Sequence, residues 1–232
     1  MSDSRGSVDT IKAFLRSSPD SQQTTEFYDT CCEMYDQDAE LLNYRGPDLG
    51  VDCLLSNFSG RREEVQVLDV GCGSGLVAKA MSEVGFRNFV GVDGSKGMLE
   101  LAEKTGLYQH LRLALLGTEP LPADTDMFDV VILVGALAPG FIPVSVVREL
   151  CQAARPGGLV CLVRGNHRGA DSDRYRVELH SELWRMEEAG LWSLLGTNHC
   201  DRYMIDTHLS QQGEPFISGM VHLYRKSMHP ST

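Results

Sequence analysis

Short apolar runs alternate with helix-type patterns through most of the chain. Runs typical of buried strands cover 65–70, 89–92, 111–115, 128–134, 159–163, 191–196 and 217–224. Between them, apolar residues recur at helical spacing, as at 76–84, 96–105, 144–154 and 172–189. Strands that alternate with helices indicate a largely parallel sheet with helices on both faces.

The first part of the chain lacks this alternation. Residues 1–25 are polar apart from a short amphipathic stretch at 8–15, so we expect a loosely attached helical extension. Helices are also expected near 27–36 and 48–58, before the first strand. The expected organisation is an extension (1–25), one domain (26–226) and a polar tail (227–232).

Composition and charge argue against several classes of protein. The chain has 21 basic and 32 acidic residues, a formal net charge of −11, and no cluster of Lys and Arg. Nucleic-acid-binding proteins usually carry a basic stripe, so we expect no nucleic-acid partner. We also expect no membrane span and no secretory segment. The seven cysteines include no C-x-x-C pair, which indicates reduced thiols, a cytoplasmic protein and no metal site.

A glycine-rich turn follows the first strand. The sequence from Val67 to Gly75 reads VLDVGCGSG, and the helical pattern begins at Leu76. A strand, a glycine turn and a helix together form a unit that binds nucleotides at the helix N-terminus. Dinucleotide folds require a third glycine where Leu76 stands, and an acid, Asp69, precedes this turn. A turn of this kind can also serve only to tighten a loop.

A second acidic residue, Asp93, ends the second strand, 18 residues beyond Gly75. A carboxylate at this place can accept both hydroxyl protons of a ribose. An Asp after a strand can instead form a turn or cap the next helix. The combination with the glycine turn on the neighbouring strand favours the ribose interpretation.

These two segments resemble the first two motifs of the class I S-adenosylmethionine-dependent methyltransferases. Residues 128–131 and 155–158 resemble the lead into that family's fourth strand and the turn before its fifth. The resemblance implies a doubly wound, Rossmann-like α/β fold with a seven-stranded, mostly parallel sheet, a reversed last strand and a helical N-terminal lid. More narrowly, 44–47, 51–54, 117–122 and 156–162 resemble the methyltransferase-like family of the Williams–Beuren region.

The resemblance also implies how S-adenosylmethionine is bound. The glycine turn would lie against the amino-acid end of the cofactor, with Asp69 near its ammonium group. Asp93 would hold the ribose, Met98 would pack on the adenine, and the turn 117–119 would face the adenine edge. The common family pattern has Asp at the position of Gly117. The expected cofactor-binding residues are Asp69, Gly71, Cys72, Gly73, Asp93, Gly94, Met98, Gly117, Thr118, Glu119, Val134, Tyr28, Tyr35 and Arg45.

Two Tyr-Asp pairs, beginning at Tyr28 and Tyr35, lie seven residues apart and so share a helix face. Family members carry a similar segment over the cofactor, so the two rings would form a lid that faces the sulfonium. They can equally be core tyrosines of an amphipathic helix. Arg45 is a candidate ligand for the cofactor carboxylate or a substrate anion, or a solvated arginine.

Candidates for a catalytic role are His167 and Tyr35. His167 follows the fifth strand, where substrate loops lie, and an imidazole can act as a general base near neutral pH. It can also be an ordinary surface histidine. Residues 201–203 are further candidates for a substrate mouth.

The predicted function is methyl transfer from S-adenosylmethionine to a small molecule by in-line displacement, with S-adenosylhomocysteine as product. The segment 134–139 lacks the Asn/Asp-Pro-Pro-aromatic pattern of amide and exocyclic-amine methyltransferases. Two alternatives remain at this point. One is a cofactor-binding partner protein without catalysis, and the other is a nicotinamide-dependent oxidoreductase. The oligomeric state and the acceptor atom are not predicted.

Overall fold

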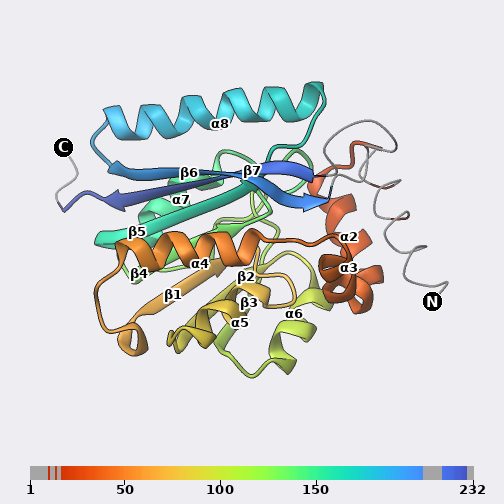
Figure 1. The fold of residues 1–232 in the computed structure, drawn as a ribbon, viewed down its shortest axis with the longest axis horizontal. Helices are drawn as coiled ribbons and strands as arrows, with labels where there is room; N and C mark the ends of the chain where they lie inside the picture. Colours follow the sequence, from red (N-terminus) through yellow and green to blue (C-terminus); the bar gives the residue numbers. More distant parts are fainter. Residues whose placement is uncertain (1–9, 11–13, 15–16, 206–215, 229–232) are drawn as a thin grey trace.

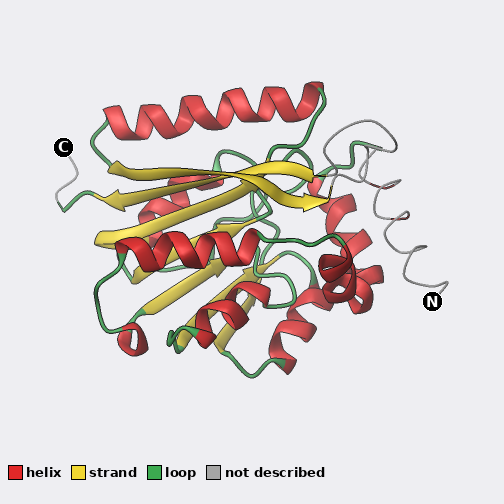
Figure 2. Ribbon diagram, in the orientation of Figure 1, coloured by secondary structure: helices red, strands yellow, loops and turns green. Residues whose placement is uncertain are grey.

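A central β-sheet carries helices on both faces (Figures 1 and 2). The computed structural model describes residues 17–205 and 216–228, together with Thr10 and Phe14. The helices are α2 (Ser21–Cys31), α3 (Tyr35–Leu41), α4 (Gly46–Asn57), α5 (Leu76–Glu83), α6 (Lys96–Lys104), α7 (Val146–Ala153) and α8 (Ala170–Glu188), with 3-10 turns η1 (Cys32–Met34) and η2 (Arg62–Glu64). The strands are β1 (Gln66–Val70), β2 (Asn88–Asp93), β3 (Tyr108–Leu113), β4 (Phe128–Val134), β5 (Ala154–Gly165), β6 (Trp192–Ile205) and β7 (Phe216–Lys226).

The strand order is β3-β2-β1-β4-β5-β7-β6. Strands β1 to β5 pair in parallel, and β7 runs antiparallel to both β5 and β6. This arrangement confirms the expected seven-stranded α/β sheet with a reversed last strand. The chain order reverses between β1 and β4, and ligands of doubly wound folds bind beyond the carboxyl ends of strands at such a point.

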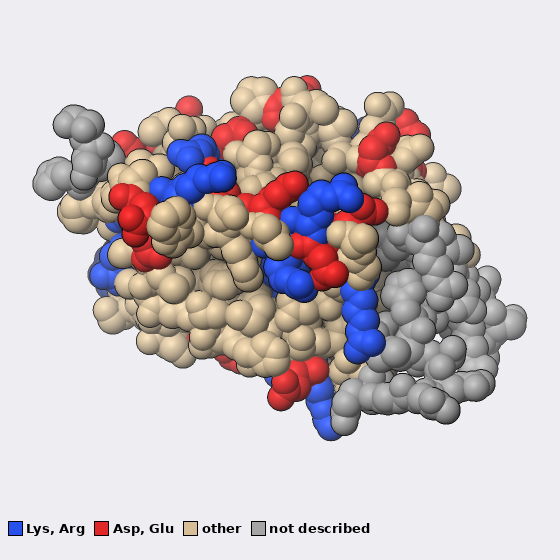
Figure 3. Space-filling view, turned by 90° about the horizontal axis from the view of Figure 1, so that it is seen from above, with Lys and Arg blue, Asp and Glu red and all other residues tan. Residues whose placement is uncertain are grey.

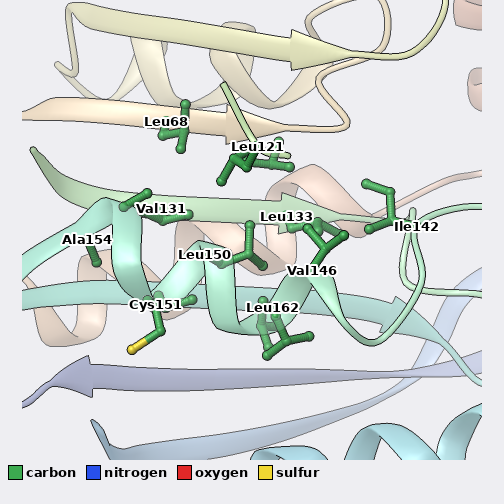
Figure 4. Close-up of a cluster of buried hydrophobic side chains, with 14 of the residues drawn as sticks. Leu68, Leu121, Val131, Leu133, Ile142, Val146, Leu150, Cys151, Ala154 and Leu162 are labelled. Atoms are coloured by element: carbon green, nitrogen blue, oxygen red, sulfur yellow. The ribbon is translucent and has the colours of Figure 1, made fainter. Parts of the chain in front are cut away.

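Apolar side chains of the central strands bury the two faces of the sheet. In β4 every residue except Asp129 is buried, as its continuous apolar run predicts. One face packs on α7 and α8, and Figure 4 shows part of this cluster around Leu133 and Leu150. The other face packs on α4 and α5 through Leu54 and Met81. Each such side chain contributes about 1.5–3 kcal/mol on burial.

The helix boundaries follow from local capping. Ser95 caps α6 by accepting a hydrogen bond from the Met98 amide at 3.1 Å, as predicted. After α5 and α6 the chain turns at Gly85 and Gly106, with φ of 105° and 67°, which glycine adopts without strain. Across the described residues, no helix combines the length and the apolar character that a bilayer span requires.

Two strands differ from the sequence prediction. The third strand was expected at 111–115 but runs from Tyr108 to Leu113, because this edge strand is partly exposed and its apolar signal is weak. The sixth was expected at 191–196 but extends to Ile205. Irregularities in its pairing with β7 at Leu194/Gly196 and Cys200/Met204 interrupt the alternation that would reveal a long strand.

The N-terminal region also differs from the prediction. The expected helix at 27–36 is divided by η1 into α2 and α3. Helix α2 begins at Ser21, where Asp20 and Gln23 form a capping box, so ordered packing starts before residue 26. The predicted stretch 8–15 lies almost wholly outside the described residues.

Candidate functional site

A cavity of about 900 Å³ lies beyond the carboxyl ends of the central strands, between the sheet and the N-terminal helices. Of the expected site residues, eight side chains or glycines line it together with His167: Tyr28, Tyr35, Gly71, Gly73, Asp93, Gly94, Met98 and Val134. These residues come from α2, α3, α6 and the ends of β1, β2 and β4. The fold therefore brings together segments that are distant in the sequence.

The glycine turn after β1 is tied to the neighbouring strand. The amides of Gly71 and Cys72 donate to the Val92 carbonyl at 2.8 and 3.1 Å. Gly71 and Gly73 have φ of 66° and 53°, in the left-handed region that favours glycine. Apart from its two chain neighbours, no described residue has an atom within 4 Å of the place that a Cβ of Gly73 would take. The turn thus leaves bare backbone next to the cavity.

Asp93 links this turn to the N-terminus of α6. Its Oδ2 accepts a hydrogen bond from the Gly73 amide at 2.8 Å, and its Oδ1 accepts one from the Ser95 amide at 2.9 Å. Burial raises the pKa of this carboxyl, while the backbone hydrogen bonds oppose the shift. Each oxygen keeps a lone pair beyond these bonds. Both interpretations of Asp93, turn former and ligand group, are compatible with this geometry.

Asp69 is fully buried beside the glycine turn. The Tyr108 hydroxyl donates to its Oδ2 at 2.7 Å, and its Oδ1 has no partner among the described residues. Burial raises the pKa of Asp69 to about 7, although the Tyr108 hydrogen bond acts in the opposite direction. A buried carboxyl oxygen without a partner is costly, and a cationic group of a ligand would satisfy it.

In each Tyr-Asp pair the tyrosine lines the cavity and the aspartate accepts hydrogen bonds from neighbouring segments. The rings of Tyr28 and Tyr35 line the cavity and meet edge to face, with centroids 5.9 Å apart. Asp29 accepts hydrogen bonds from the Ser95 hydroxyl at 2.6 Å and the Gly97 amide at 2.9 Å. Asp36 accepts one from the Ser74 hydroxyl at 2.5 Å.

The aspartates therefore fix α2 and α3 to the rims of the cavity, a role that the sequence reasoning missed. The repeated Tyr-Asp spacing was the available signal. Because the helix breaks at η1, the shared face of a single helix does not explain the arrangement. Instead, each aspartate anchors its own helix and leaves the preceding tyrosine at the cavity.

The turn at 117–119 lies beside the cavity, which is lined here by Ala114, Leu115 and Leu116 instead. The Thr118 hydroxyl donates to the Leu115 carbonyl, and Glu119 Oε2 accepts from the Leu115 amide, both at 2.8 Å. At Gly117, φ is 98° and a Cβ would clash with Pro143. This explains why Asp does not occur there.

The remaining expected residues divide between the cavity and its surroundings. Asp69, Arg45 and Cys72 are absent from the lining. The Arg45 amide donates to the Tyr203 carbonyl at 2.9 Å, and Cys72 is buried with its sulfur toward Gly91. His167 lines the cavity after β5, and of 201–203 only Tyr203 does so. No cluster of His, Cys, Asp and Glu within the described part of the chain could hold a metal.

Comparisons with known proteins agree with this geometry. Residues 68–162 match the family described as "Methyltransferase domain". The chain is 43% identical to Methyltransferase-like protein 27 of Homo sapiens over 85% of its own length and 80% of that protein. It is 30% identical to the ubiquinone biosynthesis O-methyltransferase of Vibrio vulnificus, over 61% of each chain.

Two solved structures share the fold. The [4+2]-cyclase SpnF gives a TM-score of 0.63 at 16% identity, covering 91% of this chain and 97% of that one. An S-adenosylmethionine-dependent methyltransferase from Mesorhizobium loti gives 0.53 at 17% identity, covering 75% and 96%. At these identities the likeness shows the fold alone.

Proposed function

The chain belongs to the class I S-adenosylmethionine-dependent methyltransferases, and from this premise we propose that its methyl acceptor is a small molecule. S-adenosylmethionine is the methyl donor and S-adenosylhomocysteine the product. Family membership excludes the nicotinamide-dependent oxidoreductase considered above.

The observation that carries the small-molecule proposal is the shape of the site. One cavity of about 900 Å³ extends from Asp93 and Met98 to His167, and Tyr28 and Tyr35 on the N-terminal helices line it as well. Sites for small ligands are concave and of this order of size. The cofactor would fill the end near Asp93, which leaves a limited volume for the acceptor near His167.

The residues near Asp69 and Asp93, at the donor end of the cavity, offer the groups that S-adenosylmethionine requires. When bound, S-adenosylmethionine would supply a methyl group activated by its sulfonium, with S-adenosylhomocysteine as the leaving group of the in-line displacement. Asp93 keeps lone pairs for the ribose hydroxyls, and the buried Asp69 Oδ1 offers an acceptor for the ammonium group. Tyr28 and Tyr35 would exclude water and place their rings near the sulfonium.

Alignment of the acceptor with the methyl group and exclusion of water can supply most of the rate enhancement. Effective molarities of well-oriented groups correspond to about 7–11 kcal/mol in favourable cases. Burial raises the pKa of Tyr28 and Tyr35, so neither phenol ionises near neutral pH. Tyr35 would therefore act by contact alone. His167 is the side chain we assign to proton removal from acceptors that must lose a proton.

Surface charge and thiols support the remaining expectations. On the face covered by α8, acidic and basic side chains alternate, as in the ion pairs Arg148–Glu182 and Arg176–Asp173 (Figure 3). This view offers no basic stripe for a polynucleotide. The seven cysteines are free thiols, which fits a reducing compartment, and we place the protein in the cytoplasm on that ground.

The proposal is tested with methyl-labelled S-adenosylmethionine and a cell extract divided by ultrafiltration. We expect label in a compound of the filtrate that chromatography separates from S-adenosylmethionine, and Asp93→Ala to abolish its formation. Transfer confined to the retained macromolecules would contradict a small-molecule acceptor. Cofactor binding without any transfer would instead support the alternative of a partner protein without catalysis.

A further inference from the structure

Two tyrosines outside the cofactor motifs, Tyr44 and Tyr203, meet at the end of the cavity next to β4 and β5. Their rings lie edge to face with centroids 5.4 Å apart. The Tyr203 hydroxyl donates to the Tyr44 hydroxyl at 3.4 Å. The bond uses one of the two phenolic hydrogens, so the other remains available, and the structure gives it no other partner among the described residues.

Four glycines make room for this pair. A Cβ at Gly46 or at Gly135 would clash with the Tyr44 hydroxyl. A Cβ at Gly165 would lie 2.8 Å from Tyr203 Cε1, and one at Gly219 would clash with the same ring. Gly165 and Gly219 are also register partners of β5 and β7. Smaller side chains in place of Tyr44 and Tyr203 would not require glycine at these four positions. Packing alone therefore does not account for two phenols here.

Both phenols are neutral donors. Burial is the main cause that raises the pKa of Tyr44 and of Tyr203 well above the ordinary value of a phenol. Neither can therefore serve as a base near neutral pH. A neutral phenol with a free hydrogen recognises an oxygen or another lone-pair acceptor, and it offers nothing to an ammonium group.

A buried cation, Arg164, has no counter-ion among the described residues and interacts electrostatically with Tyr203 of the pair. Arg164, the residue before Gly165 on β5, is only 4% exposed, and its Nε has no partner. Its guanidinium carbon lies 5.9 Å from the centroid of the Tyr175 ring, and it forms no ion pair or hydrogen bond with any residue in the described ranges. Tyr175 and Tyr203, the two tyrosines that interact with it electrostatically, both line the cavity.

A buried, uncompensated guanidinium is costly, and a negative charge brought by a ligand offsets that cost. The cation also favours anions over neutral molecules in the adjacent cavity. This end lies on the β5 side, whereas the glycine turn and Asp93 follow β1 and β2. The free phenolic hydrogen therefore lies on the β5 side of the cavity, and Arg164, which does not itself line the cavity, interacts electrostatically with Tyr175 and Tyr203, which do.

We propose that this end of the cavity binds an anionic oxygen of the methyl acceptor, a carboxylate or an ionised hydroxyl. Tyr44 donates its hydrogen to that oxygen, Tyr203 positions Tyr44, and Arg164 supplies the positive field behind them. The inference rests on the proposed methyl transfer to a small molecule. It adds the charge of the acceptor and the residues that select it.

The test compares two molecules of the same shape, benzoate and benzamide, by calorimetry on protein saturated with S-adenosylhomocysteine. We expect benzoate to bind about tenfold more tightly, the scale of one hydrogen bond to a charged group. The ratio should fall to about one in Tyr44→Phe and in Arg164→Met. Arg164→Lys should keep part of the preference, and Tyr203→Phe should give an intermediate ratio.

The matched control is Tyr224→Phe, which removes a buried phenol that stacks on Trp192 away from the cavity. It should keep the ratio of the unmodified protein. Equal binding of the two probes, or an unchanged ratio in Tyr44→Phe, would overturn the proposal. So would a Tyr44→Phe variant that binds S-adenosylhomocysteine poorly but 5′-methylthioadenosine normally, because the phenol would then serve the cofactor carboxylate.

These readouts need no turnover. A protein with the expected probe ratio but no methyl transfer would contradict the proposed function and leave the anion site in place. A protein that transfers methyl groups without discriminating between the probes would contradict only the anion site. Thermal unfolding of each variant identifies any that fail to fold. If Arg164→Met fails to fold, Arg164→Lys and Tyr44→Phe carry the test.

Discussion

Replacement of Asp69 by Asn should remove a pH dependence that the buried carboxyl imposes on cofactor binding. Burial raises the pKa of Asp69 from its ordinary value of 3.8 to about 7, against the opposing hydrogen bond from Tyr108. The carboxyl is therefore protonated in the free protein below about pH 7. An ammonium group at Asp69 Oδ1 requires the ionised form, so binding must release a proton below that pH.

The size of the effect follows from this shift. Affinity for S-adenosylhomocysteine should rise about tenfold per pH unit between about pH 5 and 7 and then level off, because one proton is displaced per ligand bound. In the free protein the sign is opposite. The proton on folded Asp69 contributes stability that is fully present below about pH 4 and is lost as the pH rises through about 7. The whole window corresponds to about 4 kcal/mol as an upper limit.

Calorimetric titrations across this pH range, in two buffers of different ionisation enthalpy, measure both the affinity and the number of protons released. Asp69→Asn should bind more weakly and without a pH slope. The control Asp52→Asn, on the exposed side of α4, should retain the slope. A wild-type affinity that is flat between pH 5 and 7, or an equal slope in Asp69→Asn, would refute both the shifted pKa and the ammonium contact.

Three further substitutions test the rest of the site. Asp93→Ala should weaken binding of S-adenosylhomocysteine at least about tenfold by calorimetry, and should also lower the melting temperature because two backbone amides lose their acceptor; unchanged affinity would remove Asp93 from the ribose. Asp36→Asn weakens the anchor on Ser74, so dissociation of S-adenosylhomocysteine should accelerate about three- to tenfold in surface plasmon resonance, and an unaltered rate would argue against a lid. Gly135→Ala places a Cβ against the Tyr44 hydroxyl at φ of 79°, so it should cost about 1–3 kcal/mol in urea unfolding; a Tyr44→Phe background should recover part of that loss, and no recovery would contradict the clash.

The donor end of the site was predictable because its information is local. Asp69 lies near the end of β1, the glycine turn follows β1, and Asp93 ends β2. An apolar run identifies each strand, and the order of these residues along the chain matches their order in space. Parallel pairing of β1 and β2 then brings Asp93 to the Gly73 amide. The expected fold was confirmed for the same reason, since each strand–helix unit has its own periodicity and its own cap.

Other features were not predictable because they depend on contacts between distant segments. Nothing in the sequence near Gly117 shows that Pro143 occupies the space of a side chain there, or that the segment 117–119 lies outside the cavity lining. The length of β6 was hidden by pairing irregularities with β7. The roles of Asp29 and Asp36 depend on hydroxyl and amide groups that lie between 38 and 68 residues away in the sequence.

The acceptor end of the site shows why a donor can be identified from sequence more readily than an acceptor. Tyr44 precedes α4, Tyr203 lies near the end of β6, and Arg164 is on β5, so no short motif contains them. Each of the glycines around the two phenols would be assigned, on sequence alone, to a turn or a strand end. Only packing shows that they face aromatic rings. A glycine at a strand end that does not turn the chain can indicate a large side chain packed against its backbone. Beside a cavity, such a glycine is therefore informative about the acceptor. In this protein that side chain belongs to a pair of phenols with one free hydrogen, and Arg164, which has no counter-ion among the described residues, interacts electrostatically with Tyr203 of the pair; we expect this combination to select for charge before shape.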